Sequence, residues 1–232
     1  NNLISNKCSY LGFHLENNFF KNNNKELKKD KELNFVCSGG LNSISRKNID
    51  LIFEVFYELF NKNNVNNVKL NILIQGVEIP QQLSLEHPNI KKKIKNFSYN
   101  DNLHNLFEND IYIHLGGQEG LGIGFYEALY MGIPIITLDW TPNNEIIINN
   151  YNGWLIECYQ DKVYENTECL INRGLIKKEN LKNKINEIIN NMDNTLNIIN
   201  NTIKNKEILI NKNKNKFFKN FKKYLSPIPD FN

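Results

Sequence analysis

The chain has 232 residues, of which 41% are hydrophobic and 23% charged, and its formal net charge is +3. This is the composition of a globular protein, and so small a charge argues against a protein that binds nucleic acid. No apolar run approaches the roughly 18 residues that span a bilayer, and no signal peptide is recognisable, so we expect a cytoplasmic protein. Because the sequence starts with Asn1 rather than Met, we expect it to be a piece of a longer protein.

Neither the cysteines nor the lysines point to a particular function. The four cysteines form no CxxC pair and have no histidine at metal-ligand spacing, which favours free thiols in a reducing compartment. Many lysines fall near the C-terminus, where a solvated helix face explains them. Contact of this tail with a membrane surface stays open.

From residue 33 onward the expected elements alternate between short apolar strands and amphipathic helices. Residues 1–32 read as a lead-in segment, because a short apolar stretch there is followed by a run of Asn and Lys. Apolar runs bounded by glycine or polar residues predict strands at residues 33–38, 70–74, 94–97, 111–115 and 135–138. Apolar residues at helical spacing predict helices at residues 49–60, 103–107, 123–131, 145–148 and 181–203, and an amphipathic helix with its tail in 206–232. Asp101 is the expected N-cap of the second helix, and Gly132 the expected end of the third.

This alternation predicts an α/β fold with a Rossmann-like parallel sheet and helices on both of its faces. We expect residues 33–205 to form one domain of this kind. In such sheets, ligands bind outside the carboxyl ends of the strands. The loops expected to carry function therefore lie at Gly39, Gly76, Phe97, Gly116 and Asp139.

The loop after the expected fourth strand is the most informative stretch, with the sequence GGQEGLGIGFYEA from Gly116. Glycines allow backbone N–H groups to approach a ligand closely, and the following helix presents its positive N-terminal end, which suits a diphosphate. Glu127 lies about one turn into that helix, so its carboxylate can return to the same pocket. An ionised carboxylate only accepts hydrogen bonds and pairs naturally with the two adjacent hydroxyls of a ribose. By itself, the pattern is equally compatible with a tight turn and a solvent-facing glutamate.

This stretch resembles the signature of glycosyltransferase family 4. The run EGLGIGFYEAL from Glu119 contains two glutamates separated by seven residues, and GIPII from Gly132 contains the Gly-x-Pro that precedes a strand. Further pieces follow in the order of the family, namely EII from Glu145 and NGWL from Asn152. The resemblance covers about residues 33–158.

The resemblance implies a GT-B fold, a nucleoside diphosphate sugar as donor, and transfer with retention of the anomeric configuration. UDP is a slightly better expectation than GDP on the frequency of donors in the family. Glu127 would hold the ribose diol, and Glu119 would contact the sugar hydroxyls. The backbone of Gly120, Leu121 and Gly122 would meet the sugar and the phosphate.

The resemblance also indicates which residues supply the positive charge of the site. RKNID from Arg46 resembles the stretch that supplies a basic side chain to the donor diphosphate, so Arg46 and Lys47 would neutralise this group as it leaves. A solvated pair at the start of a helix is the alternative. Gly40, Gly76 and Phe97 lie where the family has its other donor-side loops. No metal is expected, because two cations and a helix end can do the same work.

The sequence departs from the family pattern at two places. The family usually has an arginine directly after the glycine of the first loop, whereas Leu41 follows Gly40 here. Residues 138–144 replace a more glycine-rich segment, and Trp140 within them either shapes the pocket or merely covers it.

The implied partners are a nucleotide-sugar donor, an unknown glycan, lipid or protein acceptor, and a second domain of the same protein. A GT-B enzyme has two Rossmann-like domains, and the acceptor-binding one is normally N-terminal. Nothing in this sequence is long enough to form it, although residues 1–32 resemble the interdomain connection and the C-terminal helix resembles the one that crosses back. We therefore expect this chain to bind the donor and to be inactive or nearly so by itself.

Two other classes of function stay open from the sequence. A dinucleotide-dependent oxidoreductase is weakened because the third glycine of GxGxxG would fall at Phe125, and because the motif follows a late strand. A non-catalytic module that binds a sugar nucleotide is harder to separate from an enzyme. His114 is expected to be a hydrogen-bonded core residue rather than a base, and the other histidines lack a carboxylate or cysteine partner at useful spacing.

Overall fold

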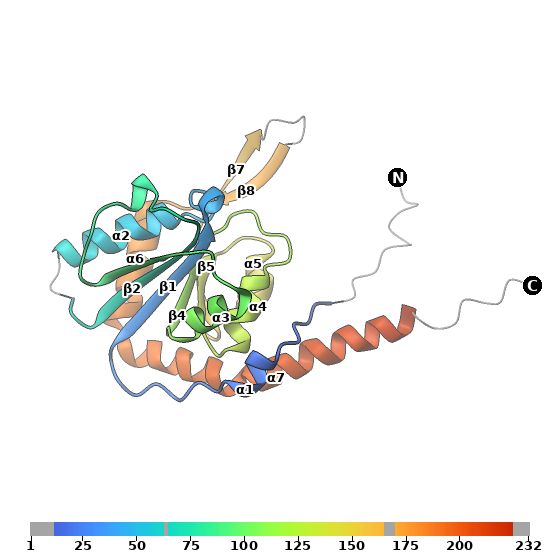
Figure 1. Cartoon of the computed structure of the whole chain (residues 1–232). Coiled ribbons are helices and arrows are strands. Elements are labelled where there is room, and N and C mark those ends of the chain that lie inside the picture. Colours follow the sequence, from blue (N-terminus) through green and yellow to red (C-terminus); the bar gives the residue numbers. More distant parts are fainter. Residues whose placement is uncertain (1–11, 63–64, 165–169, 225–232) are drawn as a thin grey trace, which may run out of the picture.

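The computed structural model describes residues 12–62, 65–164 and 170–224. A six-stranded parallel sheet lies at the centre, in the order β3-β2-β1-β4-β5-β6, with helices on both faces (Figure 1). The predicted α/β, Rossmann-like fold is thereby confirmed. The strands are β1 (Leu33–Gly40), β2 (Val68–Gln75), β3 (Ile90–Ile94), β4 (Ile111–His114), β5 (Ile135–Leu138) and β6 (Gly153–Ile156).

The helices divide between two core clusters, one on each face of the sheet. Helices α2 (Ile49–Lys62) and α6 (Lys178–Asn190) contribute to one cluster, and α3 (Tyr99–Phe107) and α4 (Ile123–Tyr130) to the other. The long helix α7 (Met192–Tyr224) contributes to both and runs along the bottom of the view in Figure 1. The short elements are α1 (Asn18–Asn22), α5 (Asn143–Ile146) and the 3₁₀ turns η1 (Leu41–Ser43) and η2 (Gln81–Leu83). No helix in the described part of the chain is long and apolar enough to cross a membrane.

The central strands are mostly apolar because both of their faces are covered. In β4, Ile111 and Ile113 belong to the cluster that contains α2, whereas Tyr112 between them belongs to the cluster that contains α4. Successive side chains of a strand point to opposite faces, so a strand between two helical layers shows a continuous apolar run. Each apolar side chain buried in this way contributes about 1.5–3 kcal/mol.

Strand β3 and helix α3 differ from their expected bounds. The strand expected at residues 94–97 is β3, which ends at Ile94. As an edge strand it carries three consecutive lysines instead of the apolar run that marks a central strand. Helix α3 is capped by Ser98, whose Oγ accepts a hydrogen bond from the Asp101 N–H at 3.1 Å, so Asp101 lies in the first turn and is not the cap.

The C-terminal third also differs from the expected elements. The helix expected at residues 145–148 is α5, which begins at Asn143. Helix α7 is continuous over 33 residues, so the expected boundary between residues 205 and 206 falls inside it. Strand β6 and the antiparallel hairpin of β7 (Tyr159–Tyr164) and β8 (Leu170–Leu175) were not expected. Strands are predicted from apolar runs. A two-stranded hairpin is held by backbone hydrogen bonds and needs no such run, so its strands are not apparent from the sequence.

Two of the four cysteines lie within the described residues. Cys37 and Cys158 both carry free thiols, as expected. Cys8 and Cys169 lie outside the described residues.

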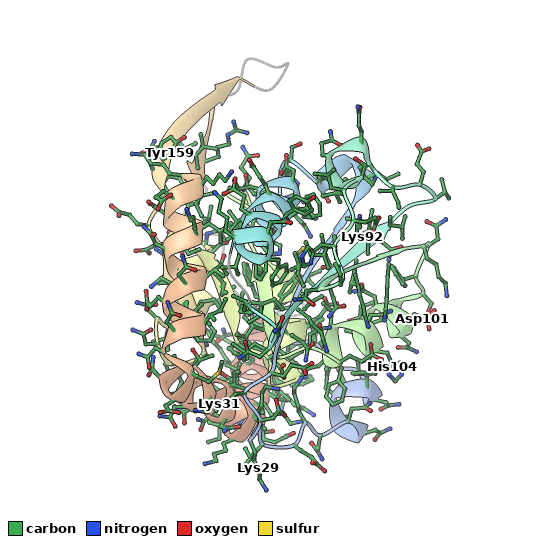
Figure 2. The ribbon with its side chains drawn as sticks, turned by 90° about the vertical axis from the view of Figure 1, so that its left-hand side faces the viewer. Lys29, Lys31, Lys92, Asp101, His104 and Tyr159 are labelled. Atoms are coloured by element: carbon green, nitrogen blue, oxygen red, sulfur yellow. The ribbon has the colours of Figure 1, made fainter. Side chains whose placement is uncertain are left out.

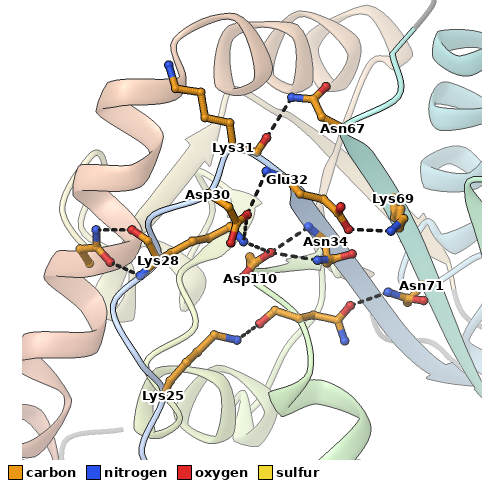
Figure 3. Close-up of polar contacts among 12 residues, drawn as sticks. Lys25, Lys28, Asp30, Lys31, Glu32, Asn34, Asn67, Lys69, Asn71 and Asp110 are labelled. Carbon is orange, nitrogen blue, oxygen red and sulfur yellow. Dashed lines mark hydrogen bonds and ion pairs between the residues drawn. The ribbon is translucent and has the colours of Figure 1, made fainter.

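Polar contacts fasten the described part of the lead-in segment, residues 12–32, to the amino ends of β1 and β4 (Figure 3). Lys28 Nζ lies 3.1 Å from Asp110 Oδ2, and both side chains are largely buried. The same carboxylate oxygen accepts a hydrogen bond from the Asn34 backbone N–H at 2.9 Å. Figure 2 shows Lys29 and Lys31 of this segment at the opposite end of the domain from Tyr159 on the hairpin. This segment is packed as part of the domain, and its role as an interdomain connection stays a prediction.

Candidate functional site

A cavity of about 420 Å³ opens where the strand order reverses, at the carboxyl ends of β1 and β4. Open α/β sheets bind ligands at such a point, because the loops on its two sides run in opposite directions and leave a crevice. The lining residues are Ser38, Gly39, Gly40, Arg46, Lys47, Leu73, Gln75, Asn102, Tyr112, His114, Glu119, Leu121, Gly122, Ile123, Gly124 and Glu127. Most of the residues predicted for the site are among them.

The glycine-rich loop leads into helix α4, whose N-terminal end borders this cavity. Gly122 is the N-cap of α4, and its φ of 65° lies in the left-handed region that favours glycine. A Cβ at this position would also lie 2.4 Å from the ring of Phe125. No side chain of the described residues caps this end of the helix, and Ile123 and Gly124 of the first turn both line the cavity. Because a helix N-terminus carries partial positive charge and unpaired N–H groups, this side of the cavity suits an anion.

Two cationic side chains, Arg46 and Lys47, reach the same cavity from the turn that precedes α2. Asn48, the next residue, has φ of 52°, and its Nδ2 donates to the carbonyl oxygen of Leu115 at 2.7 Å. This bond ties the turn to the carboxyl end of β4. Burial lowers the pKa of Lys47, against the opposing effect of the charge on Glu119. The predicted pair thus borders the cavity that receives the helix N-terminus.

Glu119 is held through one of its oxygens by two donors. His114 Nε2 lies 2.8 Å and Arg46 Nη1 lies 3.2 Å from Glu119 Oε1. Burial opposes ionisation of Glu119, but the hydrogen bond and the charge interaction with His114, together with the charges of Lys47 and Arg46, outweigh it and lower its pKa to about 2. Burial also lowers the pKa of His114. At neutral pH the pair is therefore an ionised carboxylate and a neutral imidazole.

Glu127 enters the cavity from helix α4 and is only 8% exposed. Burial raises its pKa, while a hydrogen bond with Tyr99 and the charge of Lys47 act in the opposite direction. The two glutamates of the predicted motif therefore border one cavity with opposite changes in pKa.

Three of the predicted residues lie outside the cavity lining. A Cβ at Gly120 would meet nothing within 4 Å, so packing does not require glycine there. Gly76 lines a shallower hollow beside the cavity, together with Gly40. Phe97 lies next to a lining residue, since its N–H donates to Gln75 Oε1 at 2.9 Å. A contact of these residues with a ligand stays a prediction.

Several lining residues were not singled out in the sequence. Ser38 and Tyr112 are polar positions near the carboxyl ends of otherwise apolar strands, and this placement was the available signal. Their hydroxyl oxygens lie 3.1 Å apart. His114 is a hydrogen-bonded core residue, as expected, with its Nδ1 3.1 Å from the Tyr112 hydroxyl, and it also lines the cavity.

The hairpin of β7 and β8 contacts the loop that carries Glu119. The Gly174 N–H donates to the carbonyl oxygen of Gly117 at 3.2 Å, and a Cβ at Gly117 would lie 1.9 Å from the Gly174 oxygen. A Cβ at Gly174 would lie 2.8 Å from the Trp140 ring. Trp140 therefore packs on the hairpin and is not part of the cavity lining.

A family model described as glycosyl transferases group 1 matches residues 18–205 of this chain. A search of curated proteins finds no match. Among solved structures, the chain is similar to Alr3699/HepE of Anabaena in complex with UDP-glucose, with 14% sequence identity and a TM-score of 0.58 over 84% of this chain and 49% of that one. It is also similar to WaaG, a glycosyltransferase involved in lipopolysaccharide biosynthesis, with 17% identity and a TM-score of 0.54 over 77% of this chain and 44% of that one.

A third similar structure is the C-terminal domain of LpcC, a glycosyl transferase group 1 family protein of Francisella tularensis. Identity is 14% and the TM-score is 0.53, over 73% of this chain and 82% of that one. At these identities the likeness shows the fold alone, and the chain spans about half the length of HepE. The family match, in contrast, extends over most of the chain. This chain belongs to the glycosyl transferases group 1 family, and its fold is that of the C-terminal half of a GT-B glycosyltransferase.

Proposed function

We propose that this chain is the donor-binding part of a cytoplasmic, retaining glycosyltransferase that uses a UDP- or GDP-linked sugar. The main support is that one cavity brings together two cationic side chains, two carboxylates and the N-terminus of α4. Cations and a helix N-terminus suit a diphosphate, and carboxylates suit the hydroxyls of a ribose and a sugar. HepE, which shares the fold, has been solved with UDP-glucose, so UDP-sugars are the first donors to test.

Each polar group is assigned to one part of the donor. Glu127 accepts hydrogen bonds from the two ribose hydroxyls, and Glu119 accepts them from the sugar. The backbone at Gly120, Leu121 and Gly122 meets the sugar and the phosphates. The remaining donor-side contacts come from the loops at Gly40, Gly76 and Phe97.

Arg46 and Lys47 act on the diphosphate during transfer. The bond between the anomeric carbon and the diphosphate oxygen breaks with its electron pair left on that oxygen, and the anomeric carbon bonds to the acceptor oxygen. The proton of the acceptor hydroxyl passes to an oxygen of the departing diphosphate or to water. Negative charge grows on the departing diphosphate, where the two cations and the positive end of α4 stabilise it. This scheme uses no metal ion.

The acceptor, a glycan, lipid or protein, binds to an N-terminal domain of the same protein in this proposal. The isolated chain then binds the donor but transfers sugar poorly or not at all. Robust transfer to a simple acceptor by this chain alone would contradict that part.

A thermal-shift series tests donor binding. The unfolding temperature is measured with UDP, GDP, sugar derivatives of each and NAD, for the wild type and for Glu127→Ala. A ligand at a hundred times its dissociation constant stabilises by about 2.7 kcal/mol, which raises the unfolding temperature of a domain of this size by roughly 5–10 °C. We expect one nucleoside diphosphate and its sugar derivatives to stabilise the wild type, and Glu127→Ala to lose this shift.

Glu26→Ala is the matched control, because Glu26 is exposed and is not among the residues that line the cavity. Its neighbours Lys25 and Lys28 contact Phe107 and Asp110, which precede β4 at its amino end. The Glu26→Ala variant should keep the full shift. No shift with any diphosphate, or a shift with NAD alone, would show that the proposed function is wrong.

A further inference from the structure

A row of hydrogen-bonded side chains joins the end of β1 to Glu119. Ser38 Oγ lies 3.1 Å from the Tyr112 hydroxyl, which lies 3.1 Å from His114 Nδ1, and His114 Nε2 lies 2.8 Å from Glu119 Oε1. Tyr112 is 2% and His114 4% exposed. Ser38, Tyr112 and His114 have no role in the proposed function, but they are connected by hydrogen bonds to Glu119, which has one.

Each proton in this row follows from the ionisation of Glu119. A carboxylate only accepts hydrogen bonds, so His114 Nε2 carries a proton and donates it. Burial lowers the pKa of His114, so the ring is neutral and its Nδ1 is a bare acceptor. The Tyr112 hydroxyl therefore donates to Nδ1, and its oxygen accepts from Ser38. The row sets the tautomer of the imidazole.

The same contacts leave one oxygen of Glu119 for a ligand. His114 and Arg46 both bond to Oε1, and among the described residues no hydrogen bond to Oε2 is present. A Cβ at Gly116 would lie 2.8 Å from Glu119 Oε1 and 3.0 Å from His114 Nε2. Glycine at this position therefore makes room for the bond between His114 and Glu119.

We propose that His114 is a positioning residue for the sugar of the donor, holding Glu119 through Oε1 so that Oε2 accepts from the sugar hydroxyls. Tyr112, backed by Ser38, donates to the bare Nδ1 of the Nε2–H tautomer that the bond to Glu119 requires. This inference rests on the proposed function, because it names the residue through which Glu119 recognises the sugar. His114 itself touches neither the nucleoside nor the diphosphate in this scheme.

Binding measurements separate this role from a merely structural one. Dissociation constants for UDP, UDP-glucose, GDP and GDP-mannose are measured by calorimetry for the wild type, His114→Leu and His114→Gln. In His114→Leu we expect the affinity for the preferred sugar nucleotide to fall about tenfold, which is the effect of losing a hydrogen bond to a charged group. The affinity for the matching nucleoside diphosphate should stay within about twofold of the wild-type value. His114→Gln should restore most of the loss, because its carboxamide nitrogen can donate from nearly the same place as Nε2.

Two binding results would overturn the inference. One is His114→Leu with wild-type affinity for the sugar nucleotide. The other is an equal loss for the sugar nucleotide and the nucleoside diphosphate, since a general disturbance of the cavity weakens both.

Nitrogen NMR of the histidine rings tests the geometry without any ligand. The chain has four histidines, and the signals of His114 are those that vanish in His114→Gln. At neutral pH we expect a neutral His114 ring with the proton on Nε2, and Tyr112→Phe should shift the Nδ1 resonance while Nε2 stays protonated. A charged ring, or a proton on Nδ1, would refute the inference. If the wild type binds none of the four compounds, the proposed function is wrong, and the ring spectrum alone decides whether His114 holds Glu119.

Discussion

Glu119 and Glu127 show how neighbours decide the chemistry of a residue. Burial acts to raise the pKa of both carboxyls. At Glu127 its effect outweighs the opposing effects of Tyr99 and Lys47, so the pKa of Glu127 is raised. At Glu119 the hydrogen bond from His114 and the nearby cations prevail, so the carboxylate is stabilised. The two glutamates belong to one motif, with seven residues between them, yet their partners come from different strands, helices and turns.

Glu119 should make the stability of the chain dependent on acidic pH. Its pKa is about 2 in the folded chain against an ordinary value of 4.5. A lowered carboxyl pKa contributes stability that is present above the ordinary value and is lost as the pH falls towards the folded value. Between about pH 5 and pH 2, the wild type should therefore lose on the order of 2–3 kcal/mol more of its unfolding free energy than Glu119→Gln.

Urea unfolding at a series of pH values measures this difference. Carboxyls remote from Glu119 contribute equally to both proteins and cancel in the comparison. His114 does not cancel, because Glu119→Gln removes the charge that raises its pKa, and this reduces the measured difference. Parallel pH profiles for the wild type and Glu119→Gln would contradict the assignment of an ionised Glu119 bound to His114.

At the scale of elements, the hairpin of β7 and β8 acts as a brace for the glycine-rich loop. Its contact is between backbones, at Gly117 and Gly174, and the Trp140 ring lies close to Gly174 as well. The loop that carries Glu119 is therefore held from outside the sheet as well as by its own helix.

Gly117→Ala should break this brace. Its Cβ would lie 1.9 Å from a backbone oxygen, which no side-chain rotation relieves. We expect a destabilisation of about 1–3 kcal/mol, as for other overpacked sites, with weaker binding of the preferred nucleoside diphosphate sugar. Urea unfolding and calorimetry measure the two effects.

Gly120→Ala is the matched control in the same loop. A Cβ there meets nothing within 4 Å, so the free energy of unfolding should change by no more than about 0.5 kcal/mol. Binding should weaken in this variant if the backbone of Gly120 approaches the donor as proposed. Equal destabilisation by the two substitutions would show that the hairpin does not brace the loop.

At the scale of the whole molecule, the lead-in segment joins the first strand, the fourth strand and the C-terminal helix. Lys28 pairs with Asp110 at the start of β4, and its backbone exchanges two hydrogen bonds with the Asn200 side chain on α7, at 2.8 and 3.0 Å. These contacts lie at the amino ends of the strands, away from the cavity at the carboxyl ends. Substitutions among these contacts should therefore lower the free energy of unfolding without changing a residue that lines the cavity.

Asp110→Ala should destabilise the chain by about 3–5 kcal/mol, because it leaves the largely buried Lys28 ammonium without its buried partner. Asp30→Ala removes the other carboxylate on Lys28, at 2.9 Å, but Asp30 is 69% exposed, so its loss should be about 1 kcal/mol or less. Chemical unfolding of both variants checks this difference. Similar losses for the two would mean that burial does not set the strength of the pair.

The sequence by itself was sufficient for the α/β fold class and for the two cations, the two carboxylates and the glycine-rich loop of the cavity. Apolar runs mark β1, β2, β4 and β5 because both faces of these strands are covered. Gly117 and Gly122 mark the loop because a close backbone contact and a positive φ require glycine there. Each of these features depends on one continuous segment, so it can be predicted from the sequence of that segment.

Only the tertiary structure decided what brings separate segments together. The row from Ser38 through Tyr112 and His114 to Glu119 crosses two strands and a loop, and its first three members belong to no motif that points to the cavity. The contact between Gly117 and Gly174 joins residues far apart in the chain. Burial and distance create these interactions, and neither can be derived from spacing in the sequence, because strands that are neighbours in the sheet are separated by whole helices in the chain.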